Sequence, residues 1–182
     1  AMIYASVRFL PEWHIPLTVA NFLLLGLASG FLLAAAYSAW LGNELVTFFG
    51  FWAVVATGLG LVTRGASLPR LGRIKPKSSP QTAIGIRHRT LVQIAQGATA
   101  GSFNTREFFH GASPATLKWV RRLFLVLVFP LPVLLLLVGH ALASRWLPLV
   151  AFGVQYLGLL LERWSFFAEA GHPQNLYYQG VA

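Results

Sequence analysis

The sequence contains no cysteine and no aspartate, and only 10% of its 182 residues are charged. Without cysteine the chain has no disulfides, no thiolate zinc site and no iron–sulfur cluster of its own. A soluble domain carries about a quarter charged residues. Phosphate-binding glycine loops, a nucleophile elbow and a His-x-x-x-His pair are also missing. We therefore expect no catalytic residue and no metal ligand in this chain.

Long apolar runs take the place of those motifs, and 56% of the residues are hydrophobic. A helix rises roughly 1.5 Å per residue and crosses roughly 30 Å of hydrocarbon, so about 20 apolar residues span a bilayer. The sequence predicts an all-α integral membrane bundle, a single domain over residues 1–182 with four transmembrane helices. The predicted spans are residues 18–40, 45–63, 123–143 and 146–161.

Three local features predict how these spans pack. Gly26, Gly30 and Ala34 form a small-residue stripe, which favours close approach of another helix. Pro130 and Pro132 lie inside the third span and predict a kink, whose freed carbonyls need other donors. Gln155, in the middle of the fourth span, is expected to donate a hydrogen bond to a neighbouring helix.

The only long polar interval covers residues 64–122 and carries eleven Lys and Arg residues against one acid, Glu107. Its first part, residues 64–80, is rich in Pro, Gly, Ser and cations, and is expected to be extended. Residues 82–96 suit a short amphipathic helix. Ser113 followed by Pro114 predicts the start of the helix that continues into the third span.

The charge asymmetry predicts an orientation. Four spans place this basic loop and both chain ends on one face, while the opposite face holds Arg145 as its lone Lys or Arg. Such an excess of cations marks the cytoplasmic side. We therefore expect a multi-pass protein of the inner (cytoplasmic) membrane. The same rule explains the net charge of +9 without nucleic acid as a partner.

Two interpretations remain open for the polar residues near the ends of the spans. Glu162 and Arg163 can pair with each other and reach toward the membrane surface. Alternatively, they belong to a quinone and proton path, because quinone chemistry needs bases beside an apolar slot. The residues assigned to that path are Trp13, His14, Glu162, Arg163, Glu169 and His172.

Several strings carry a resemblance to a known family. GSFNTREFFHG (residues 101–111) and LLLERWSFFAEAGHPQNLYYQ (residues 159–179) resemble the DmsC-type membrane anchor subunits of molybdopterin oxidoreductases, which include sulfite-oxidising relatives. MIYASVRFLPEW (residues 2–13) and NFLLLGLASG (residues 21–30) fit as well. The resemblance covers nearly the whole chain but only the later half of the family's eight-helix fold. The family's quinol-site histidine belongs to the earlier half and is not carried over to any residue here.

The resemblance implies partners rather than a built-in active site. Members of this family bind an iron–sulfur electron-transfer subunit, which connects to a molybdopterin catalytic subunit, and they exchange electrons with ubiquinone or menaquinone. This chain would then be a non-catalytic anchor and quinone-interacting subunit in the membrane lipid, with no cofactor bound by it alone. The residues expected to contact partner subunits are Arg87, Arg89, Arg106, His110, Tyr177 and Tyr178.

Two alternatives stay open. The predicted contact residues can instead cap loops or meet lipid headgroups. A small membrane transporter or channel subunit is the other function considered; it would need polar residues along a continuous path through the membrane, and the spans offer little beyond Gln155 and Asn21.

Overall fold

The computed structural model describes residues 1–71, 73–74, 80–86, 88, 90 and 112–170, and every regular element in these ranges is an α-helix. The all-α prediction is therefore confirmed for the described part of the chain. The helices are α1 (Met2–Ala5), α2 (Pro16–Leu41), α3 (Leu45–Leu71), α4 (Pro80–Ile84), α6 (Pro114–Val128), α7 (Pro130–Ala141) and α8 (Leu147–Ala168).

The first hairpin consists of α2 and α3, and its sequence sets its limits. Pro16 occupies the first helical turn of α2, where its missing N–H costs nothing. Gly42 ends α2 with a left-handed backbone (φ 69°), a conformation that glycine adopts without a Cβ clash. The side chain of Asn43 then accepts a hydrogen bond from the Leu45 backbone N–H at 3.1 Å, which opens α3.

Proline divides the predicted third span into two helices, α6 and α7. Ser113 caps α6 by accepting a hydrogen bond from the Thr116 N–H at 3.2 Å, as the Ser–Pro pair predicted. The helix breaks at Phe129, directly before Pro130. The Val128 carbonyl, which Pro132 cannot serve because it lacks an N–H, accepts a hydrogen bond from Gln155 Nε2 at 3.2 Å. The predicted kink and the predicted interhelical bond of Gln155 are both confirmed.

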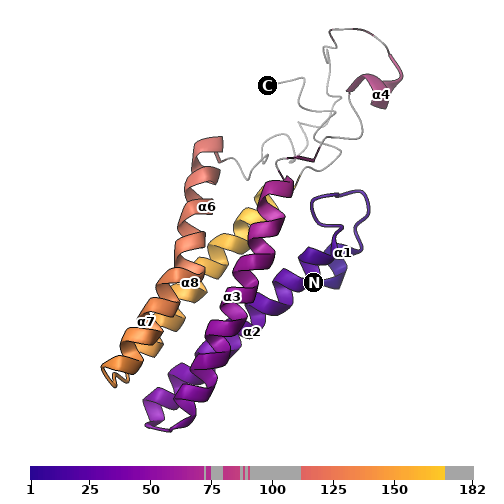
Figure 1. The fold of residues 1–182 in the computed structure, drawn as a ribbon. Helices are drawn as coiled ribbons and strands as arrows, with labels where there is room; N and C mark the ends of the chain where they lie inside the picture. The colour runs from indigo at the N-terminus through magenta and orange to yellow at the C-terminus, as the bar shows by residue number, and fades with distance from the viewer. Residues whose placement is uncertain (72, 75–79, 87, 89, 91–111, 171–182) are drawn as a thin grey trace, which may run out of the picture.

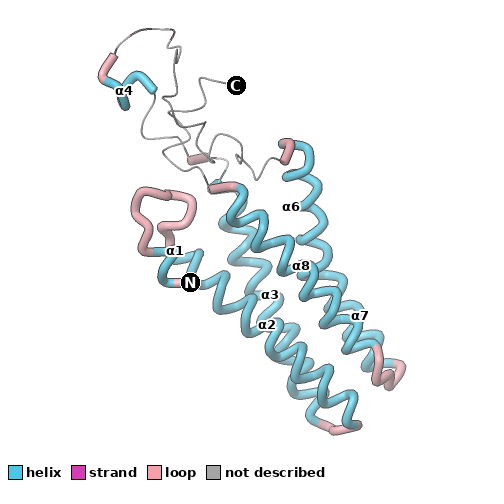
Figure 2. The backbone as a smooth tube through the Cα atoms, turned by 180° about the vertical axis from the view of Figure 1, so that it is seen from behind, coloured by secondary structure: helices cyan, strands magenta, loops and turns pink. Residues whose placement is uncertain are grey.

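The helices form one elongated bundle, seen from opposite sides in Figures 1 and 2. α2 packs along α3, while α8 contacts α6, α7 and α2 and so joins the two hairpins. The α2–α3 turn and the α7–α8 turn lie at one end of the bundle, here named the hairpin end. The opposite end holds the last turn of α3, the start of α6 and the last turn of α8, and is named the basic end.

Two apolar clusters fill the interior of the bundle. One lies toward the hairpin end and is built from Leu32, Ala35, Ala53, Leu136 and Ala151. The second lies toward the basic end and contains Leu25, Phe124, Val128 and Phe129. Large apolar side chains also cover the outside of the same helices. Such a surface suits lipid, which offers apolar side chains the same environment as the interior does.

Three helical stretches are long and apolar enough to cross a membrane, namely Pro16–Leu41, Leu45–Leu71 and the α6–α7 pair over Pro114–Ala141. This arrangement fits a multi-pass membrane protein. α8 has 22 residues, but Gln155, Glu162 and Arg163 make it more polar than the other three stretches. The fourth span therefore stays a prediction, although α8 lies alongside the others in the bundle.

The expectation that residues 64–80 are extended is wrong for their first part. α3 continues eight residues beyond the predicted end at Thr63 and reaches Leu71, with Pro69 inside the helix. Tertiary contacts outweigh the local signal of Gly, Ser and Pro. Arg64 and Ser67 point inward and bond to other helices, and this holds the extra turns.

Two further expectations differ from the structure. An added Cβ at Gly26 or Gly30 meets nothing within 4 Å, so this stripe packs against no helix of the described chain. The short helix expected over residues 82–96 ends at Ile84, because Gly85 adopts a left-handed backbone (φ 73°). Residues 91–96 of that expected helix, and the rest of the loop up to residue 111, lie outside the described residues.

Candidate functional site

A buried ion pair marks the basic end of the bundle. Arg64 Nη2 of α3 lies 2.9 Å from Glu162 Oε1 of α8, and their side chains are only 4% and 0% exposed. Neither atom makes a hydrogen bond of good geometry, so the contact is chiefly electrostatic. Charges this deep persist only when opposite charges compensate them. The pair therefore ties the α2–α3 hairpin to α8.

Helical spacing brings the two residues face to face. The inward side of α3 carries small or polar residues three or four positions apart; these are Gly50, Ala53, Thr57, Gly60, Arg64 and Ser67. The inward side of α8 repeats the pattern; its members are Ala151, Gln155, Gly158, Glu162 and Ser165. The polar members lie toward the basic end of each stripe, and small neighbours leave room for them.

A second arginine completes the environment of Glu162. Arg163 Nη2 forms an ion pair with Glu162 Oε2, so each carboxylate oxygen has its own guanidinium partner. The Arg163 guanidinium also lies over the ring of Phe22 in α2, 3.8 Å from its centroid. Both oxygens of Glu162 are therefore engaged within the protein, and neither is free to face a ligand.

A third ion pair connects α6 to the last turn of α8. Arg121 Nη2 lies 2.7 Å from Glu169 Oε1, which also accepts a hydrogen bond from Ser165 Oγ at 3.0 Å. The other oxygen of Glu169, Oε2, is buried and has no hydrogen-bond partner among the described residues. We refer to Arg64, Arg121, Glu162, Arg163 and Glu169 together as the charge cluster.

The N-terminal segment folds over this cluster. The indole of Trp13 stacks on Phe166 with a centroid distance of 5.2 Å and an interplanar angle of 10°. Its Nε1–H donates to the Phe166 carbonyl at 3.2 Å. Tyr4 of α1 packs against both rings, and Arg70 of α3 donates to the carbonyl of Pro11 at 3.3 Å. Residues before α2 thus cover the basic end of α8.

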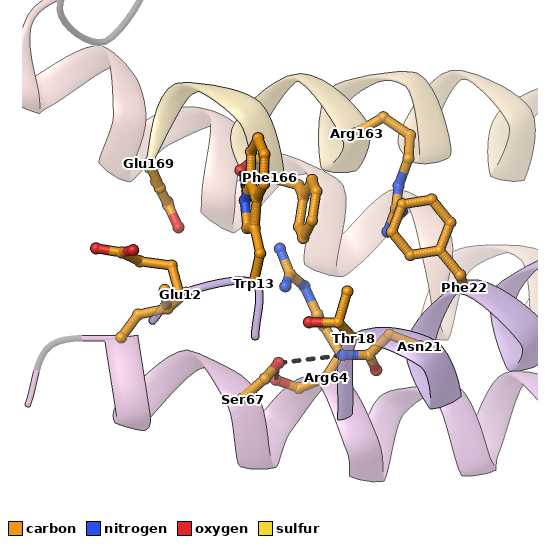
Figure 3. A pocket seen from close by; sticks show the side chains of 11 residues that line it. Glu12, Trp13, Thr18, Asn21, Phe22, Arg64, Ser67, Arg163, Phe166 and Glu169 are labelled. Atoms are coloured by element: carbon orange, nitrogen blue, oxygen red, sulfur yellow. Dashed lines mark hydrogen bonds between the residues drawn. The ribbon is translucent and has the colours of Figure 1, made fainter. Parts of the chain in front are cut away.

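A small polar cavity lies beneath Trp13, and Figure 3 shows the side chains that surround it. They come from the N-terminal segment, α2, α3 and α8. Asn21 Nδ2 donates to Ser67 Oγ at 3.3 Å along one wall. Five buried polar atoms around this space have no hydrogen-bond partner in the described part of the chain. They are Glu12 Oε2, Asn21 Oδ1, Arg64 Nε, Arg163 Nη1 and Glu169 Oε2.

The size of this cavity limits what it can hold. Its volume is about 20 Å³, enough for roughly one water molecule, which needs about 10–15 Å³. Sites for organic ligands measure about 300–1,000 Å³. The described residues therefore form no ligand-sized pocket at the basic end, and the predicted quinone contact there stays a prediction.

The structure brings together four of the six residues predicted for the quinone and proton path. Trp13, Arg163 and Glu169 line the small cavity, and Glu162 pairs with two of the arginines beside it. His14 is exposed, and its Nδ1 lies 2.6 Å from the Ala5 carbonyl instead. The other predicted residues lie outside the described residues; these are His172, Arg87, Arg89, Arg106, His110, Tyr177 and Tyr178.

Sequence reasoning missed Arg64, Glu12 and Asn21 as members of this site. Arg64 was counted with the loop because it follows the last uncharged residue of the second apolar run. The signal for it was the continued spacing of Thr57, Gly60, Arg64 and Ser67 along one helix face. Within the described ranges, no group of three His, Asp or Glu side chains is placed to hold a metal ion.

These features define the class as an all-helical protein with at least three helices able to cross a membrane, whose buried charges gather at one end. Over all 182 of its residues the chain is 66% identical to a sulfite dehydrogenase subunit of Allochromatium vinosum, and it belongs to the same family as that protein. The chain spans 56% of the length of that relative. No protein-family model matches the chain. No solved structure matches it either.

Proposed function

We propose that this chain is part of the membrane subunit of a sulfite-oxidising oxidoreductase complex. The observation that carries this proposal is the 66% identity, over every residue of the chain, to a protein named as a subunit of sulfite dehydrogenase. The helical bundle with its lipid-suited surface supports an anchoring role. Because the relative is longer, the activity and the partners of the complex belong to the proposal.

The proposed reaction divides between subunits. Sulfite and water give sulfate, two protons and two electrons, and a quinone takes up two electrons and two protons to become a quinol. A molybdopterin subunit would oxidise sulfite, and an iron–sulfur subunit would carry the electrons to the membrane. This chain has no cysteine to hold a cluster. Its own share is to anchor the complex and to shape the place where quinone is reduced.

The charge cluster divides into residues that hold the fold and residues that can exchange protons. Glu162 belongs to the first group, because guanidinium groups engage both of its oxygens. Glu12 and Glu169 belong to the second, since each presents a buried and unpartnered Oε2 beside the small cavity. A water molecule in a space of about 20 Å³ would connect them. We assign proton delivery toward quinone to Glu12 and Glu169.

The basic end is proposed as the docking face for the iron–sulfur subunit. The Lys and Arg residues of the 64–122 interval gather on this side of the bundle in the sequence order of the helices. Among those in α6, Arg122 is exposed, with its guanidinium 5.6 Å from the centroid of the exposed Trp119 ring. An aromatic–arginine pair at the surface is typical of protein interfaces. By the positive-inside rule this face is cytoplasmic.

Purification from the native membrane tests the proposal. We expect the tagged chain, extracted in mild detergent, to retain an iron–sulfur protein and a molybdopterin protein, and to reduce a quinone analogue when sulfite is added. A chain that purifies without either protein, and that carries solute across liposomes on its own, would contradict the proposal in favour of a transporter.

Variants separate proton delivery from structural support. Glu169→Gln removes both the acid and the ion pair to Arg121, whereas Arg121→Gln removes the pair alone. If Glu169 delivers protons, Glu169→Gln lowers sulfite–quinone turnover at least about tenfold, while Arg121→Gln and Glu169→Asp keep most of it. Subunit yield, measured on the same samples, reports assembly. Equal losses for Glu169→Gln and Arg121→Gln would show that only the ion pair matters.

A further inference from the structure

A second, much larger cavity opens at the hairpin end. It is a groove of about 530 Å³ between the α2–α3 and α7–α8 hairpins, within the size range of ligand sites. Its walls are mainly apolar and include Phe51 and Val54 of α3 with Leu136 and Leu137 of α7. α3 packs chiefly on α2, and α7 chiefly on α8, which leaves this space between them. The shape suits a hydrocarbon chain.

Aromatic residues place the mouth of the groove at headgroup depth. Trp40 at the end of α2 and Trp146 at the start of α8 contact each other edge to face, with centroids 5.1 Å apart. Both rings are at least half exposed. Tryptophan gathers where the hydrocarbon meets the polar headgroups. The polar residues of the two neighbouring turns therefore lie among lipid headgroups.

The mouth carries one cation and one anion that do not pair with each other. Glu44 and Arg145 both line the groove, and both are exposed. The ion pairs formed within the described residues involve neither of them. A Cβ added at Gly42 would lie 3.6 Å from Arg145 Nη2, so this guanidinium reaches across from the α7–α8 turn to the α2–α3 turn. The groove thus ends between two separate and opposite charges.

We propose that this groove binds a zwitterionic phospholipid with a primary ammonium headgroup, such as phosphatidylethanolamine. One acyl chain lies between α3 and α7, the phosphate pairs with Arg145, and the ammonium donates to Glu44. Charge complementarity selects this headgroup. A purely anionic lipid leaves Glu44 without a partner and close to a like charge, and a trimethylated ammonium has no N–H for the carboxylate. The proposal does not depend on sulfite oxidation or on quinone.

Lipid retention measures the proposed preference. The protein, purified with any bound subunits, is exchanged into nanodiscs of equal phosphatidylethanolamine, phosphatidylcholine and phosphatidylglycerol content, then released for native mass spectrometry. We expect phosphatidylethanolamine to be retained about tenfold more than either competitor, since a charge-assisted hydrogen bond supports a difference of that size. Retention of phosphatidylglycerol at or above that level, or of a quinone in place of phospholipid, would overturn the proposal.

Variants assign the preference to the groove. Glu44→Gln is expected to remove the preference over phosphatidylcholine, and Arg145→Gln to lower retention of all three lipids. Leu137→Trp fills the groove from an exposed position and should lower retention without disturbing the core. Arg8→Gln is the matched control, because Arg8 is an exposed cation distant from the groove lining. Unchanged lipid selection in Glu44→Gln would refute the headgroup assignment.

Discussion

Arg64 of α3 and Glu162 of α8 meet at 2.9 Å inside the bundle, although 98 residues separate them in the chain. No water-exposed surface stabilises either charge, since their side chains are 4% and 0% exposed. The pair is a long-range contact that joins the first hairpin to the last helix. It also sets the position of Arg163 and the small cavity beside it.

Removing one partner of this pair should destabilise the bundle strongly. Arg64→Met leaves Glu162 with one cation in a buried place, and losing one member of a buried pair costs about 3–5 kcal/mol. The double variant Arg64→Met with Glu162→Leu leaves no uncompensated carboxylate and should recover part of that loss. Unfolding titrated with a denaturing detergent measures both, with Arg8→Met as the exposed control. A double variant as unstable as the sum of the two single variants would contradict this account.

The hydrogen bond from Gln155 to the Val128 carbonyl predicts a coupling with Pro132. Gln155→Leu leaves that carbonyl without a donor and should cost about 1–3 kcal/mol. Pro132→Ala restores a backbone N–H that can reach the same carbonyl. In the Pro132→Ala background, Gln155→Leu is therefore expected to cost clearly less. A full double-mutant cycle checks this, and an equal cost in both backgrounds would refute the coupling.

Close packing of α8 on the end of α6 makes Gly158 intolerant of a side chain. A Cβ there would lie 2.8 Å from Leu127 Cβ and from Val128 Cγ2. Gly158→Ala should therefore destabilise the protein by about 1–3 kcal/mol through overpacking. Gly153, one helical turn or more away in α8, meets nothing within 4 Å, so Gly153→Ala is the matched control and should be neutral or stabilising. Similar melting temperatures for the two variants would argue against this packing.

The sequence predicts the helices better than it predicts the site. Apolar length located α2 nearly to the residue, and proline positions located the break between α6 and α7. Local patterns could not show that α3 continues to Leu71, because Arg64 becomes helical and buried only when Glu162 is present beside it. Composition marks Arg64 as a loop residue, and only a contact across 98 residues corrects that assignment.

Accessible cysteines can settle whether α8 is a fourth span. The 182 residues include no cysteine, so single replacements report without background from this chain. Ala112→Cys and Ala170→Cys lie at the basic end, and Leu142→Cys lies at the hairpin end. We expect a membrane-impermeant maleimide to label the first two from the cytoplasmic side and Leu142→Cys from the other side. Labelling of Ala170→Cys together with Leu142→Cys would mean that α8 does not cross.

The most direct test of the central claim is the location of sulfite-dependent quinone reduction in cells with and without this chain. Membranes and soluble fractions are assayed separately with sulfite and a quinone analogue. The account predicts that the activity is in the membranes when the chain is present. Without it, sulfite oxidation with an artificial soluble acceptor should move to the soluble fraction while quinone reduction is lost. Unchanged quinone reduction in membranes that lack the chain would contradict its role as anchor and quinone-interacting subunit.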